Sequence, residues 1–275
     1  MDRYHGRMNV SHATLDIAAR LWDGVRETAL AWWRSIYLGA VVLVMLMSPS
    51  SYRRLVRGRM AYQLYVQTGP VLLGFTALAA LLCAVITRIV IVTALSYGLS
   101  RYALEMVVRV LVLELIPLTA CLFVAMRCTI PNGSQLAQLR MRGHIAALQQ
   151  RGLDAVRSEL LPRAVGGLFA CLTLAALSCV VALFTVYLSV YGFTLAGMPA
   201  YTRLFGQVFT PAVTLVFTLK TCFFSLAVAL IPLAAGWYTP LPRLQRFQER
   251  EIGGLARMFA VLLLIEVLSL MGNYY

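Results

Sequence analysis

The chain has 275 residues, of which 60% are hydrophobic and only 13% are charged. A soluble domain of this size carries about a quarter charged residues, and several apolar runs exceed the ~18 residues that indicate a membrane-spanning helix. The composition therefore excludes a soluble protein and predicts an all-α polytopic membrane protein. The net charge of +13 comes almost wholly from arginines beside apolar runs, which indicates cytoplasmic loops and argues against nucleic-acid binding.

The sequence of residues 1–68 predicts N-terminal helices that are amphipathic and lie at the membrane interface. The first 28 residues can form an amphipathic cytoplasmic helix whose apolar face holds Leu15, Ala18, Ala19, Leu21 and Trp22. In residues 30–47 the uninterrupted apolar stretch is short for a span, and Trp32, Trp33 and Tyr37 prefer the headgroup level. We therefore favour an interfacial or re-entrant helix here. A true span stays the alternative, and it would move residues 1–29 outside.

Residues 69–275 predict one membrane domain with five core spans. The apolar runs lie at about 69–97, 103–126, 164–192, 206–236 and 253–273. Arginines gather in the loops 51–67, 127–163 and 237–252, which the positive-inside rule places in the cytoplasm. This distribution fits five alternating spans with the C-terminus outside.

The longest of these basic loops, residues 127–163, is the most informative segment of the chain. It contains six arginines and predicts two short helices joined by a tight turn. Gly152 can end the first helix in a left-handed conformation, and Asp154 can cap the next one. The result is a rigid cytoplasmic elbow that suits a groove on a partner protein. The alternative is that the elbow only packs on the spans of its own chain.

No pattern in the sequence predicts catalysis, a cofactor site or a metal site on this chain. The G-x-x-x-x-G-K-S/T pattern that cradles ATP phosphates is absent, and so is H-E-x-x-H. No serine or cysteine lies beside a plausible histidine base on a span, which argues against an intramembrane enzyme. Five of the six cysteines lie in apolar runs, where they behave as small hydrophobes. We therefore expect any energy source to lie on another subunit.

Several charged residues fall inside the predicted spans, where charge is costly and often marks a pathway or a buried pair. Glu105 and Arg109 are four residues apart and can pair on one helix face. Glu114 precedes Pro117, which predicts a kink and an unpaired backbone carbonyl. The other intramembrane charges are Arg88, near the outer end of the first span, Lys220, in the middle of the fourth, and Glu266, in the fifth.

Six short motifs, in order, resemble the MlaE (YrbE) family of ABC-transporter permeases over roughly residues 52–272. The family's L-L-R-E-L-G-P, A-G-R and x-P-R patterns are similar to Leu113–Pro117, Ala125–Arg127 and Leu161–Arg163. Its cytoplasmic helix, ending in V-D-P, resembles His144–Ala155. Its Q-L-Y-x-x-G-V and K-S-x-x-F patterns resemble Tyr62–Gly69 and Lys220–Phe224. Each motif alone is weak, but their order and spacing together are specific.

The chain departs from the family pattern at several places. Leu113 replaces the arginine before the glutamate, and Ile116 replaces the glycine before the proline. The acid at the start of the cytoplasmic helix falls at Gly143, and the proline after the aspartate is Ala155. A short insertion lies around Thr129–Asn132. These differences indicate a divergent branch of the family.

The resemblance implies a homodimer in the bacterial inner membrane, bound to two copies of a cytoplasmic ABC ATPase that holds the ATP. It also implies a periplasmic Mce-domain partner, often a STAS-domain subunit, and phospholipid or another hydrophobic cargo. The expected ATPase-coupling residues are Ile145, Ala147, Leu148, Arg151, Gly152 and Asp154. The candidates for an intramembrane lipid path are Glu114, Pro117, Arg127, Lys220 and Arg88. The alternative function is a membrane scaffold that anchors partner subunits without passing cargo.

Overall fold

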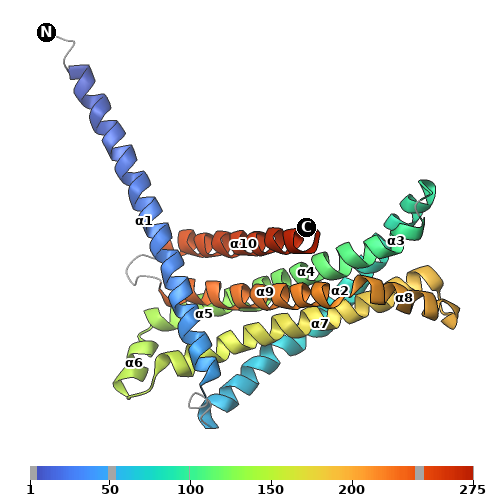
Figure 1. Cartoon of the computed structure of the whole chain (residues 1–275). Coiled ribbons are helices and arrows are strands. Elements are labelled where there is room, and N and C mark those ends of the chain that lie inside the picture. The colour runs from blue at the N-terminus through green and yellow to red at the C-terminus, as the bar shows by residue number, and fades with distance from the viewer. Residues whose placement is uncertain (1–4, 49–53, 99, 239–244, 275) are drawn as a thin grey trace.

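The structure is a computed structural model that describes residues 5–48, 54–98, 100–238 and 245–274 (Figure 1). Nearly all of these residues are helical, and no strand occurs among them. By length and composition, six helices of this described part could cross a membrane: Gly24–Met47, Arg57–Ser96, Leu104–Met141, Val156–Tyr191, Pro211–Trp237 and Gly253–Gly272. The predicted class, an all-α multi-pass membrane protein, is confirmed.

Long helices form a bundle, and short helices gather at its two ends (Figure 1). The helices in chain order are α1 (His5–Met47), α2 (Arg54–Ser96), α3 (Ser100–Val107), α4 (Ile116–Val124), α5 (Ile130–Met141), α6 (His144–Gln150), α7 (Leu161–Tyr191), α8 (Met198–Val208), α9 (Pro211–Trp237) and α10 (Gln245–Tyr274). A 3-10 turn, Leu195–Gly197, precedes α8. Helices α3, α4 and α5 follow one another along a single rod, because π-helical segments join them.

Each of three π-helical segments ends two residues before a proline. The segments are Val108–Leu115 before Pro117, Ala125–Thr129 before Pro131, and Val156–Leu160 before Pro162. Proline has no N–H and cannot donate the next backbone hydrogen bond, so the regular register breaks there and resumes in a new α-helix. The predicted irregularity at Pro117 is therefore present as a π-helical bulge.

The helices alternate in direction as five successive spans require. Helices α2 and α7 run parallel, as the order of the contacts along the two segments shows. The contacts are, in chain order, Arg59 with Glu159, Gln67 with the Arg163 carbonyl, and Cys83 with the Ala182 carbonyl. The rod from Leu104 to Met141 returns the chain between α2 and α7. Helix α9 packs on α5, α7 and α10 and completes the bundle.

The second span is longer than the sequence predicts. The apolar run ends at about residue 126, but the helical rod continues to Met141 and buries Asn132, Gly133 and Leu136. Close packing explains the extension, since a Cβ on Gly133 would lie 2.5 Å from the Pro232 carbonyl oxygen on α9. Residues 127–141 of the predicted cytoplasmic loop 127–163 are thus part of the bundle. The fourth span also begins later than predicted, at Pro211, after the separate helix α8.

Helix α1 crosses one end of the bundle obliquely (Figure 1). Its C-terminal half contacts α7 and α9 through the buried residues Leu38 and Val42, while Trp33 and Tyr37 are exposed. Its segment Gly24–Met47 has the length and hydropathy of a membrane span. Those two criteria therefore do not exclude the alternative that this segment crosses the membrane. The choice between an interfacial helix and a span therefore stays a prediction.

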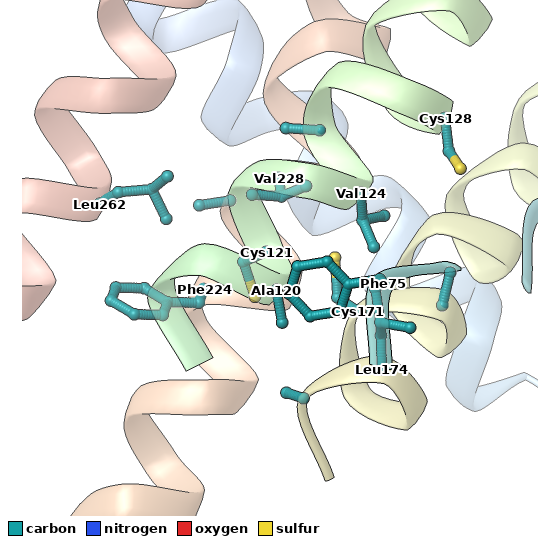
Figure 2. Close-up of a cluster of buried hydrophobic side chains, with 14 of the residues drawn as sticks. Phe75, Ala120, Cys121, Val124, Cys128, Cys171, Leu174, Phe224, Val228 and Leu262 are labelled. Carbon is teal, nitrogen blue, oxygen red and sulfur yellow. The ribbon is translucent and has the colours of Figure 1, made fainter. Parts of the chain in front are cut away.

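Three clusters of buried apolar side chains hold the bundle together. The central cluster joins α2, α4, α7, α9 and α10, and Figure 2 shows Phe75, Cys121 and Cys171 converging within it. A second cluster lies around the π-helical segment Val108–Leu115. There the Cys179 thiol lies 3.6 Å from the Val112 carbonyl oxygen. Pro117 has no N–H and so cannot donate a hydrogen bond to that carbonyl. The third cluster packs α1, α6 and Ala155 against the ends of α2, α7 and α9.

Candidate functional site

The elbow that the sequence predicts lies at residues 142–155 and has the expected turn. Gly152 adopts φ +70° and ends α6. The Leu153 amide donates to the Leu148 carbonyl and the Gly152 amide to the Gln149 carbonyl, both at 3.0 Å. This pair of bonds is the Schellman arrangement, which favours glycine at the left-handed position. The left-handed conformation predicted for Gly152 is confirmed.

The two ends of the elbow are also defined by local hydrogen bonding. Asp154 Oδ1 accepts a hydrogen bond of 3.0 Å from the Val156 amide, which is the capping contact that the sequence predicts. At the other end Gly143 has φ +75° and turns the chain from α5 into α6. Both turns use glycine where other residues would be strained, so the elbow has one preferred shape.

The six predicted coupling residues divide between two faces of the elbow. Ile145 and Leu148 are buried, and Ile145 belongs to the same apolar cluster as Leu38 of α1 and Leu233 of α9. The other four are exposed: Ala147, Arg151, Gly152 and Asp154. The elbow is therefore anchored to its own chain by one face, as the alternative interpretation requires, and its second face is exposed in this chain.

An ionic node at Glu159, which sequence analysis did not single out, joins two long helices and lies beside the start of the elbow. The Glu159 carboxylate lies 3.1 Å from Arg59 of α2 and 2.6 Å from Arg163 of α7. His144 Nε2, at the start of α6, lies 3.9 Å from the same carboxylate. The only signal in the sequence was the spacing of Glu159 and Arg163, four residues apart on one helical face. No local pattern could reveal the contact with Arg59.

A second ionic cluster lies inside the bundle and consists of Glu114, Lys220 and Glu266. Lys220 of α9 forms an ion pair with Glu114, at the end of the π-helical segment, and its Nζ lies 2.9 Å from Glu266 Oε2 on α10. The Lys220 side chain is only 2% exposed. A buried lysine held by two carboxylates cannot snorkel to the membrane surface, so Lys220 is part of the internal packing.

The five candidates for a lipid path do not come together in one place. Glu114, Pro117 and Lys220 meet around the π-helical segment, and all three are buried. Arg88 on α2 and Arg127 on the α4–α5 rod are exposed and belong to neither ionic cluster. The prediction that these two arginines line a path is not tested by their positions in one copy of the chain.

An apolar groove of about 650 Å³ runs along the outer face of α9. Its lining residues are Phe209, Pro211, Thr214, Leu215, Thr218, Leu219 and Cys222. The hydroxyls of Thr214 and Thr218 donate to the carbonyls four residues earlier, those of Thr210 and Thr214, at 3.0 and 2.8 Å. Because these polar groups are already hydrogen-bonded, the groove can accept hydrocarbon chains without leaving a donor unpaired.

These features define a multi-pass helical membrane protein whose elbow packs against the ends of its long helices. The profile of the family described as Permease MlaE matches residues 60–272, which is most of the chain. The chain therefore belongs to the MlaE permease family, as the motifs predicted, and it is a transport subunit rather than an enzyme. No curated protein matches the chain closely enough to count as a relative.

Proposed function

We propose that the chain is the membrane subunit of an ABC transporter that moves phospholipid or another hydrophobic molecule between the bacterial inner membrane and a periplasmic Mce-domain partner. The observation that carries the proposal is the elbow, whose buried face is fixed to the bundle and whose exposed face is available to a second protein. Family membership supports the transport role.

The elbow is connected to the long helices by two independent routes. Ile145 packs in the apolar cluster that includes residues of α1, α2, α7 and α9. His144 of the elbow lies 3.9 Å from the Glu159 carboxylate, which in turn contacts Arg59 of α2 and Arg163 of α7. A force applied to the exposed face at Ala147 and Arg151 would therefore act on several helices at once, because packed helices move as rigid units.

The proposed ATP-binding partner is a separate cytoplasmic ATPase that docks on the exposed face of the elbow. ATP and its phosphate-binding residues belong to that partner, since this chain has no pattern that cradles phosphates. The transporter would contain two copies of the chain, with a STAS-domain subunit as a further component. The apolar groove on α9 supplies a hydrocarbon-compatible surface for the cargo.

Purification of the complex from its native membrane distinguishes transport from the scaffold function. A permease is expected to retain an ATPase in stoichiometric amount, together with extractable lipid in the dimer. A scaffold would retain partner proteins without bound lipid and without lipid-dependent ATP hydrolysis. A purified complex that holds neither ATPase nor lipid contradicts the transport proposal.

A further inference from the structure

The turn between α7 and α8 exposes two large apolar side chains. Phe193 is 95% exposed, more than any other large apolar residue of the described ranges, and Leu195 is 79% exposed. Both lie between Tyr191, the last residue of α7, and Met198, the first residue of α8. In Figure 1 this turn lies at the end of the bundle opposite α6 and the elbow. A single exposed apolar residue is ordinary, so the order of this turn and its depth relative to the membrane decide what covers the pair.

The turn is held in one conformation by contacts with α7 and α8. The Tyr187 hydroxyl donates to the Thr194 carbonyl, and the Thr194 hydroxyl donates to the Tyr191 carbonyl at 2.9 Å. The turn also packs closely against the Tyr191 ring, because a Cβ on Gly197 would overlap that ring. The centroid of the Tyr187 ring lies 5.3 Å from that of Tyr201 on α8. Side chains on a fixed turn lose little freedom when they bind, so the turn is preorganised for a partner.

The depth of the turn follows from the register of α2 against α7. The hydrogen bonds that join Arg59 and Cys83 of α2 to carbonyls of the segment Val156–Tyr191 both connect residues 99 positions apart. The two parallel helices therefore keep one register along their contact. By the same offset, Arg88 of α2 lies level with Tyr187 of α7.

Arg59 and Arg88 mark the two headgroup levels of the membrane. Both side chains are exposed, that of Arg59 at 49%, and an exposed arginine near the end of a span extends its guanidinium group to the headgroups. At about 1.5 Å per residue the helix between them is about 44 Å long, or about 41 Å along the membrane normal at an average tilt of about 20°. A bilayer with its headgroups is about 40–45 Å thick, so Arg88 and Tyr187 lie at its edge.

The turn that carries Phe193 and Leu195 lies beyond this edge. Helix α7 continues from Tyr187 to Tyr191, which adds about 6 Å outside the headgroup level. Lipid chains therefore do not reach the two side chains, and exposure of their apolar surface to water is unfavourable. A protein surface is the occupant that fits an ordered apolar pair at this depth.

We propose that Phe193 and Leu195 form the docking contact for a protein that covers this end of the bundle and offers an apolar pocket to the turn. The identity of that protein rests on the proposed function, in which the Mce-domain partner lies on the membrane face opposite the ATPase. A buried aromatic anchor carries much of the binding energy in protein interfaces, and Phe193 is the anchor here. Helix α7 then connects the two partners, because it begins beside the Glu159 node and ends at this turn.

Co-purification of the full complex through a tagged copy of the chain tests the docking role. Phe193→Ser should lower the molar ratio of retained Mce-domain partner about fivefold or more, and Leu195→Ser should lower it less. Phe193→Leu is the matched control, since it keeps an apolar side chain on the same turn, and it should retain most of the partner. All three variants should keep the ATPase and the thermal stability of the wild type, because both substituted side chains are exposed.

A photoreactive phenylalanine analogue in place of Phe193 identifies the occupant in intact membranes. It should crosslink to the Mce-domain partner, whereas crosslinking to lipid or to a second copy of the chain would overturn the proposal. Serine variants that retain this partner at the wild-type ratio would also overturn it and would leave the proposed transport function standing. A wild-type chain that retains its ATPase but no Mce-domain partner would contradict the proposed function and the docking role together.

Discussion

Substitution of Gly152 tests the role of the elbow's backbone conformation, because it changes that conformation without removing a side-chain contact. Gly152 has φ +70°, and a Cβ added there would meet no atom within 4 Å. A side chain at this position therefore causes backbone strain without a steric clash against the rest of the molecule. Valine disfavours the left-handed region most strongly, alanine less, and asparagine least.

The expected effect follows from the cost of the left-handed conformation. A residue other than glycine loses about 1–2 kcal/mol there, which changes the ratio of the native elbow to other conformers by a factor of about 5–30. The Schellman bonds of Leu153 and Gly152 are the contacts that compete with this strain. Because the elbow is exposed at this point, we expect the membrane bundle to keep its stability.

The assay is the ratio of lipid transferred to ATP hydrolysed in the reconstituted transporter. Gly152→Val should lower this ratio several-fold, Gly152→Ala should lower it less, and Gly152→Asn should leave it close to wild type. Thermal stability of all three variants should match the wild type. Equal ratios for the valine and asparagine variants would refute the coupling role assigned to the elbow.

Five further substitutions, in two matched pairs and one alone, test the packing and the ionic clusters. Gly236→Ala should destabilise the protein by about 1–3 kcal/mol, because the added Cβ would overlap the Gly133 carbonyl on the facing helix. Gly74→Ala should instead stabilise the protein by about 0.5–1 kcal/mol, because a Cβ at Gly74 would lie in open space. Glu159→Gln should cost about 1–2 kcal/mol, against less than about 1 kcal/mol for the exposed control Asp154→Asn. Lys220→Met should cost about 3–5 kcal/mol, because it removes the buried ammonium that contacts both Glu114 and Glu266. Thermal unfolding of the purified variants measures each effect, and an inverted order within either matched pair would contradict the packing or the ionic contact concerned.

Local features of the sequence predicted a large part of the fold and of the elbow. Apolar runs predicted the core spans, because a bilayer of fixed thickness requires a minimum apolar length. Pro117, Gly152 and Asp154 predicted a helix irregularity, a left-handed turn and a cap, since each depends on a single residue's own donors, acceptors or backbone freedom.

Contacts between distant segments were the part that the sequence could not predict. Helix α5 extends the second span because Gly133 allows close approach to α9, and hydropathy alone does not record such a fit. Glu159 binds Arg59 across about a hundred residues of sequence, and Lys220 finds its partners on two other helices. Periodicity within one helix indicates which face is apolar but does not identify the facing residue.

The most direct test of the proposed function is ATP-driven lipid transfer by the reconstituted complex. The chain would be purified with its ATPase and Mce-domain partner, placed in liposomes, and supplied with labelled phospholipid. The proposal predicts transfer that requires hydrolysable ATP and falls in the Gly152→Val variant while its ATP hydrolysis continues. Lipid transfer at the same rate without ATP, or no transfer by an intact complex that hydrolyses ATP, would contradict it.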